Sequence, residues 1–142
     1  MIHFQLVSLD GVKLDTEAYE VLLPTLDGII GVLPGHMPLI SAATHGVVSV
    51  RHQPSDKDDM MDVFAISGGV IEVADNTLRV LVDEADNADE ISETEAQKAY
   101  ELAQKMKAEA KDQVSLEHAQ SMIDRSAVRL QVAGLKRRRH RS

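Results

Sequence analysis

The sequence contains no cysteine and no tryptophan, and only two phenylalanines and two tyrosines. Without cysteine, the chain forms no disulfide, offers no thiolate nucleophile and binds no metal through sulfur. With so few aromatic rings, its core must be built mainly from Val, Ile and Leu, which suits a small sandwich and excludes a large aromatic pocket. A length of 142 residues allows one domain, or one small domain with an appendage.

Long apolar runs are also missing. No stretch reaches the roughly 18 residues that a membrane-spanning helix needs. Residues 1–5 lack the basic start and the apolar centre of a signal peptide. We therefore expect a soluble protein that reaches a membrane only through a partner.

The net charge is −8 at pH 7, and it is unevenly placed. The body of the chain is acidic, which disfavours nucleic-acid binding because that binding rests on the neutralisation of phosphates. The C-terminal tail is basic, and its cations are Lys136, Arg137, Arg138, Arg139 and Arg141. Two interpretations of the tail stay open: a solvated, frayed end, or electrostatic docking onto an acidic partner.

Motifs of enzyme active sites are absent. The sequence has no G-x-S-x-G, no G-x-x-x-x-G-K-[ST] and no H-E-x-x-H, and its six histidines are scattered. The acidic segment 56–62 does not have the spacing of a calcium-binding loop, and Lys57 interrupts it. We predict a non-catalytic protein with no metal and no resident cofactor.

Residues 1–82 show the pattern of many short strands. Apolar and polar residues alternate over positions 2–6, and Asp10-Gly11 is typical of a hairpin turn. The pair Gly68-Gly69 indicates a bend or bulge before the strand expected at residues 70–73. These features predict an N-terminal β-sandwich, or flattened barrel, of about ten short strands over residues 1–83.

One stretch of this region, from Asp27 to Ala43, combines three glycines and two prolines with aliphatic residues. Glycine adopts backbone angles that other residues avoid, and proline removes a hydrogen-bond donor, so no helix can run through it. Two apolar runs, 29–33 and 39–43, flank a rigid turn at 34–38. We predict a strand, a shaped loop and a second strand.

The composition changes at Asp83. Residues 84–91 are acidic and aperiodic, which predicts a linker. Residues 92–95, Ser-Glu-Thr-Glu, form a capping box that predicts the start of a helix. A break at 111–114, with Ser115 as the cap of a second helix and Gly134 as its stop, completes an antiparallel two-helix hairpin with a basic tail over residues 92–142.

Both predicted helices carry stripes of small residues. The first stripe is Ala96, Ala99, Ala103, Met106 and Ala110, and the second is Leu116, Ala119, Ile123, Ser126, Leu130 and Ala133. Alanine buries little apolar area, so such a hairpin is weakly held and can act as a two-state element. The alternative is a fixed hairpin packed for stability.

Three motifs, in order along the chain, resemble the epsilon subunit of bacterial F-type ATP synthase, whose mitochondrial counterpart is called delta. The first is G-x-x-G-V-L-P-G-H-x-P-L at 28–39, and the second is S-G-G-x-x-E-V at 67–73. The third is R-x-x-x-R-L-x-V-A at 125–133. The resemblance spans nearly the whole chain.

The resemblance implies a non-catalytic central-stalk subunit of a proton-translocating F-type ATP synthase. Such a subunit binds the gamma subunit and the c-ring through its sandwich and couples ring rotation to the catalytic head. Its C-terminal helices reach the alpha and beta subunits and inhibit ATP hydrolysis. The implied location is peripheral, on the cytoplasmic face of the bacterial plasma membrane.

The resemblance also assigns candidate contacts. The c-ring interface would comprise Ile29, Gly35, His36 and Met37. The family often carries an acidic residue where this chain has Ile29, so an apolar contact would replace a charged one. The cationic tail would meet acidic segments of the beta subunits.

Some family members bind ATP through I-D-x-x-R-A at the start of the first helix and two later arginines. Here Ser92 and Glu95 stand in place of Asp and Arg, while Arg125 and Arg129 match. An anion near phosphates is unfavourable, so we predict weak or absent ATP binding. Residual contacts to a nucleotide or a beta subunit would involve Ser92, Arg125 and Arg129. The alternative function is a free nucleotide-sensing module, and the alternative role of the two arginines is salt bridging at the surface.

Overall fold

The structure is a computed structural model that describes the backbone of residues 1–141 and the side chains of residues 1–136. The chain divides into two compact units, residues 1–87 and 88–142. Among the described residues, no helix is long and apolar enough to cross a membrane.

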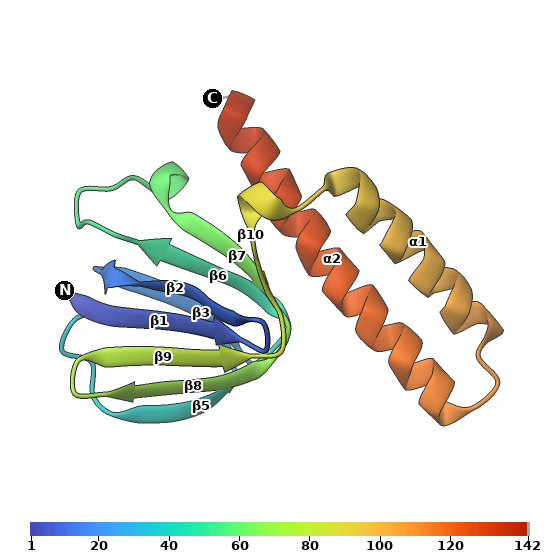
Figure 1. The fold of residues 1–142 in the computed structure, drawn as a ribbon, viewed down its shortest axis with the longest axis horizontal. Helices are drawn as coiled ribbons and strands as arrows, with labels where there is room; N and C mark the ends of the chain where they lie inside the picture. The colour runs from blue at the N-terminus through green and yellow to red at the C-terminus, as the bar shows by residue number, and fades with distance from the viewer. Residues whose placement is uncertain (142) are drawn as a thin grey trace. The chain divides into compact units, whose positions relative to one another are not determined.

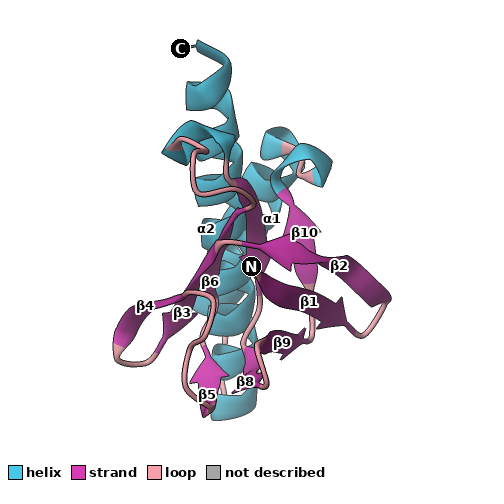
Figure 2. Ribbon diagram, turned by 90° about the vertical axis from the view of Figure 1, so that its left-hand side faces the viewer, coloured by secondary structure: helices cyan, strands magenta, loops and turns pink. Residues whose placement is uncertain are grey.

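The first unit is a ten-stranded sheet that curls around a common core, which confirms the predicted β-sandwich (Figure 1). Its strands are β1 Ile2–Ser8, β2 Gly11–Ala18, β3 Glu20–Thr25, β4 Gly28–Val32, β5 Leu39–Ala43, β6 Gly46–Arg51, β7 Asp62–Ile66, β8 Gly69–Ala74, β9 Thr77–Val82 and β10 Ala85–Asn87. Their order in the sheet is β10-β7-β6-β3-β5-β8-β9-β1-β2, and β4 pairs with β3 outside this path. The β1–β9 pair is parallel, and the other pairs are antiparallel. Figure 2 shows the β3–β4 and β1–β2 hairpins on opposite sides of this unit.

The core is aliphatic, as the composition requires. In β1, buried and half-buried residues alternate strictly, because successive side chains of a strand point to opposite faces. Phe4 and Phe64 are the two aromatic members of the core cluster. The other largest fully buried side chains are Ile, Leu and Val: Ile2, Leu6, Leu23, Ile71, Leu78, Val21, Val32, Val48, Val50, Val73 and Val80.

The glycine pair at the start of β8, Gly68 and Gly69, lies where the backbone is too close to its neighbours for a side chain. A Cβ atom on Gly69 would lie 2.0 Å from the carbonyl oxygen of Leu81 on β9. A Cβ atom on Gly68 would lie 2.8 Å from the carbonyl oxygen of Ala43 at the end of β5. The pair therefore permits close backbone approach rather than special backbone angles, since neither glycine has a positive φ.

The expected linker at 84–91 differs in the structure. Ala85–Asn87 form β10, which pairs with β7, and residues Ala88–Glu90 form a 3₁₀ turn. Ser67 and Glu84 anchor the entry to β10, since the Ser67 amide donates to the Glu84 carbonyl (3.1 Å) and the Glu84 amide donates to the Ser67 hydroxyl oxygen (2.9 Å). Ala85 is buried in the core. Three residues are too short a run for sequence periodicity to reveal a strand.

The second unit contains helices α1 Glu93–Glu109 and α2 Gln113–Arg141, which run antiparallel and confirm the predicted two-helix hairpin (Figure 1). The Ser92 hydroxyl oxygen accepts a hydrogen bond from the Glu95 amide (3.2 Å), so Ser92 is the N-cap of α1, as predicted.

Two details of α2 correct the prediction. The carboxylate of Asp112, not the hydroxyl of Ser115, caps this helix, because it accepts a hydrogen bond from the Ser115 amide (2.7 Å). That hydrogen bond lowers the pKa of Asp112. The helix also continues past Gly134, which is buried, because a single glycine weakens a helix without ending it.

Candidate functional site

The described part of the chain brings together no group of three or more metal-ligating side chains. The acidic segment 56–62 is instead bound to neighbouring cationic or imidazole groups. Arg51 pairs with Asp58 (2.5 Å) and with Glu20 (3.2 Å), and His52 contacts Asp62 (2.6 Å). These contacts support the interpretation of this segment as a structural surface loop.

Ile29 lies at the start of β4, beside the tip of the β3–β4 hairpin. Its side chain is 74 % exposed, and that of Leu26 at the tip is 82 % exposed. The Thr25 hydroxyl donates a hydrogen bond to the Gly28 carbonyl (2.6 Å) and closes the hairpin. Two large apolar side chains therefore face solvent on a hydrogen-bonded turn, which is typical of a contact surface when other apolar groups lie nearby.

Gly35, His36 and Met37 lie in the loop that follows the other end of β4. The His36 amide donates to the Leu33 carbonyl (3.1 Å), and His36 Nδ1 donates to the Met37 carbonyl (2.7 Å). These bonds hold the half-buried His36 ring against its own loop, whereas the Met37 side chain is 73 % exposed. The structure thus separates Ile29 from Met37 by the length of β4, and one partner can touch both only by lying along this strand.

An apolar stripe on the outer face of the sheet was not predicted. Strand register places one residue from each of five adjacent strands in a row: Val12, Val7, Leu81, Val70 and Ala42. All except Val7 are exposed, and Val7 is half-buried. We call this row the outer stripe. Exposed apolar rows of this kind mark protein contact sites.

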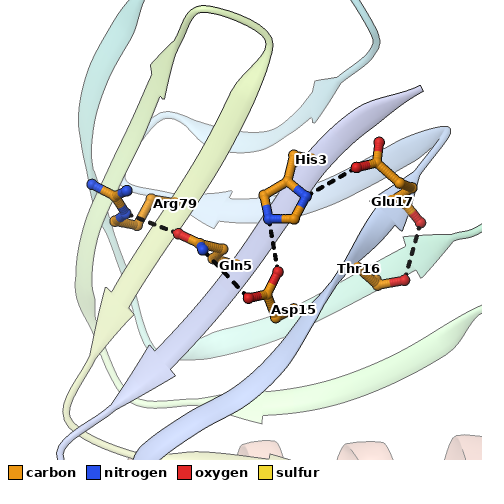
Figure 3. A network of polar contacts seen from close by, with 6 residues as sticks. All are labelled: His3, Gln5, Asp15, Thr16, Glu17 and Arg79. Atoms are coloured by element: carbon orange, nitrogen blue, oxygen red, sulfur yellow. Dashed lines mark hydrogen bonds and ion pairs between the residues drawn. The ribbon is translucent and has the colours of Figure 1, made fainter.

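A polar network (Figure 3) lies on the same face and occupies the two rows next to the outer stripe. His3 Nε2 lies 2.7 Å from Asp15 Oδ1, and His3 Nδ1 lies 3.0 Å from Glu17 Oε1. Gln5 continues the network, because its amide oxygen accepts from Arg79 Nε (3.1 Å). The hydrogen bond to Glu17, together with the negative charges of Asp15 and Glu17, raises the pKa of His3.

This arrangement predicts a pH-dependent stability of the β1–β2 hairpin. A histidine whose pKa is raised in the folded state stabilises the fold fully below its unfolded pKa of about 6.5 and loses that contribution as the pH rises through the folded value. We expect His3→Gln to lower the urea midpoint at about pH 6 and to have little effect at about pH 9. Glu17→Gln should reduce this pH dependence, because it removes the principal cause of the pKa shift. An equal effect of His3→Gln at both pH values would contradict the assignment.

The hairpin of the second unit is held by small side chains. Its buried residues on the two helices include Ala96, Ala103, Ala119, Ser126, Val132 and Ala133. Leu116, expected in the second stripe, is 36 % exposed, and Ala99, Met106 and Ala110 are half-buried. The seam between α1 and α2 therefore buries little apolar area.

The remaining predicted site residues lie along α2 and at the start of α1. Arg125 and Arg129 are half-buried and one helical turn apart, and Ser92 caps α1. Lys136 pairs with Asp89 (3.3 Å) within the second unit. The side chains of the other tail cations, Arg137, Arg138, Arg139 and Arg141, lie outside the described residues.

Known proteins that are similar to this chain come from one family, and the similarity extends over most of its length. The family profile described as "ATP synthase, Delta/Epsilon chain, beta-sandwich domain" matches residues 1–88. The ATP synthase epsilon chain of Herpetosiphon aurantiacus is 35 % identical over 138 residues, which cover 97 % of this chain and 98 % of the relative. The epsilon chain of Nostoc punctiforme is 37 % identical over 137 residues, with coverage of 92 % and 94 %.

Solved structures show the same fold. A chain in the cryo-EM structure of the Euglena gracilis mitochondrial ATP synthase, OSCP/F1/c-ring, superposes with a TM-score of 0.77 and 24 % sequence identity. The match covers 93 % of this chain and 80 % of that chain. At this identity the likeness bears on the fold alone, and it includes both the strands and the helices.

Proposed function

This chain belongs to the delta/epsilon family of F-type ATP synthase subunits, and from that premise we propose that it couples c-ring rotation to the catalytic head without chemistry of its own. The similarity to epsilon chains over nearly the full length is the observation that carries this proposal. The exposed apolar surfaces of the sandwich support it, because a coupling subunit needs at least two contact surfaces.

We assign the outer stripe to the gamma subunit. Val12, Leu81 and Val70 are exposed in one row on a rigid sheet, so a partner surface can cover them without reordering the chain. The polar network of His3 lies on the same face and would form part of the hydrophilic rim of such an interface.

We assign the β4 edge to the c-ring. β4 pairs only with β3, so its other edge is available along its length among the described residues. Ile29 lies near one end of this edge and Met37 lies in the loop beyond the other end, and both are apolar and exposed. A ring surface lying along β4 would bury both, with His36 and Gly35 shaping the second contact.

The assignment to gamma is tested by Val70→Glu, measured as binding of the full-length chain to purified gamma subunit. A charge within an apolar interface should weaken binding by about tenfold or more. Val114→Glu is the matched control, because it makes the same change at an exposed apolar position of α2. Equal loss in both variants, or no loss in Val70→Glu, would remove the outer stripe from the interface. Absence of any complex with gamma or the ring would overturn the proposed function itself.

We further propose that the C-terminal helices act as a brake on ATP hydrolysis through contacts with the alpha and beta subunits. The thin seam of small residues supports this, because a two-state element requires only a few kcal/mol between its arrangements. The basic tail, Lys136 to Arg141 in sequence, supplies the charge for docking onto acidic surfaces.

For ATP, we propose weak or absent binding. The Ser92 oxygen already accepts the capping bond from the Glu95 amide, and the Glu95 side chain adds an anion where a phosphate would need a cation. Arg125 and Arg129 alone supply favourable charge. A free nucleotide-sensing module is therefore the weaker candidate. The complex would place this chain peripherally at the cytoplasmic face of the bacterial plasma membrane.

A further inference from the structure

Asn76 connects three segments that are far apart in the sequence. It lies in the two-residue turn between β8 and β9, where both Asp75 (φ 50°) and Asn76 (φ 58°) are left-handed. Its side-chain oxygen accepts a hydrogen bond from the Gly35 amide (3.0 Å), and its side-chain nitrogen donates to the Met1 carbonyl (2.7 Å). Its backbone carbonyl accepts from the His3 amide (3.1 Å).

These requirements together select asparagine. The left-handed conformation is tolerated best by glycine, asparagine and aspartate. Only asparagine among these offers both a side-chain acceptor and a side-chain donor. An aspartate would keep the bond from Gly35 but would oppose the Met1 carbonyl with a second oxygen.

Gly35 is the point at which the loop reverses. Its φ is +79°, and its amide is oriented toward Asn76 by the turn that also joins His36 to Leu33. Met37 follows two residues later, after His36, and is exposed. The direction in which Met37 points therefore depends on how Gly35 is held.

We propose that Asn76 is a positioning residue for the 33–38 loop: it fixes Gly35 so that Met37 is presented outward at the end of β4. The positioning of the loop by Asn76 requires no partner protein. Its consequence for binding rests on the proposed contact between this loop and the c-ring.

The decisive variant is Asn76→Gly in the full-length chain, which keeps the left-handed turn free of strain and removes both side-chain bonds. The matched control is Asp75→Gly, which makes the same backbone change one residue earlier, where the structure records no side-chain hydrogen bond among the described residues. Hydrogen exchange of the Gly35 amide, followed by NMR, is the readout. We expect exchange about five- to tenfold faster in Asn76→Gly and nearly unchanged in Asp75→Gly.

A third variant, Asn76→Asp, should retain slow Gly35 exchange because the acceptor remains. Unchanged Gly35 exchange in Asn76→Gly, or equal acceleration in Asp75→Gly, would overturn the inference. Binding of purified c-ring then separates the two claims. If Asn76→Gly accelerates exchange while Met37→Glu leaves ring binding intact, the ring contact of this loop fails and the positioning role of Asn76 stands.

Discussion

Replacement of Gly69 by alanine is expected to abolish the folded β-sandwich. The new methyl carbon would lie 2.0 Å from the Leu81 carbonyl oxygen and 2.9 Å from both the Leu81 carbonyl carbon and Val82 Cα. All three atoms belong to the backbone of β9, so no side-chain rotation can relieve the clash. β8 and β9 would have to separate where they enclose Ile71 and Val80, and the expected loss exceeds about 4 kcal/mol, a large part of the stability of a small domain.

Circular dichroism and urea unfolding of the full-length chain test this expectation. Gly31→Ala is the matched control, because Gly31 also lies in a strand without a positive φ, and its added Cβ would meet only the tip of the Leu22 side chain at 3.4 Å. The control should unfold cooperatively near the wild-type midpoint. A Gly69→Ala protein with a native spectrum and an unchanged midpoint would show that β8 and β9 are not held as closely as described.

The sequence predicted correctly those elements that are determined by residues close together in the chain. Alternation over residues 2–6 reflects a strand with one face in the core, and the capping box at Ser92 reflects amides that need an acceptor at a helix start. The bend at Gly68-Gly69 was also predicted. Its reason, contact with the backbones of Leu81 and Ala43, depends on partners distant in sequence and appears only in the fold.

Features that depend on strand register could not be predicted. The outer stripe combines Val70 and Leu81 of the β8–β9 hairpin with Val12 of the β1–β2 hairpin, and none of them is unusual within its own strand. Likewise, Ala85–Asn87 carry too few residues to show a period, and their strand exists because β7 offers a free edge to pair with. The two side-chain hydrogen bonds of Asn76 could not be predicted for the same reason, since they join positions separated by 41 and 75 residues.

The candidate c-ring contacts belong to one continuous sequence motif, but in the structure the residues of this motif do not form one continuous exposed surface. Ile29 is the second residue of β4 and Met37 lies beyond the end of that strand, so the rest of β4 and the start of the loop separate them. Between them, Val32 is buried in the core. The motif therefore combines buried core residues with two exposed side chains, Ile29 and Met37, that lie apart from each other.

Removal of the helical hairpin is expected to increase ATP hydrolysis by the assembled complex about threefold or more, which corresponds to a population shift of only about 0.7 kcal/mol. The chain should be cut after Glu90, because Asn87 pairs with Phe64 in β10 and an earlier cut would damage the sandwich. The shortened chain retains the outer stripe and the β4 edge. Its binding to gamma and the c-ring, and ATP-driven proton pumping, should therefore be preserved.

We expect this increase because the contacts between α1 and α2 hold the hairpin together only weakly. Its seam consists largely of alanine. At about 25 cal/mol per Å² of buried apolar area, burial of alanine contributes far less to stability than burial of leucine.

In a full-length chain with the five tail cations replaced by glutamine, we expect a partial increase in the rate of ATP hydrolysis. This increase should be smaller at high salt, where the attraction between the tail and its acidic partner is already screened. Hydrolysis that is unchanged after the cut would exclude the brake and leave the coupling role in place, because the sandwich that carries it is intact in both chains.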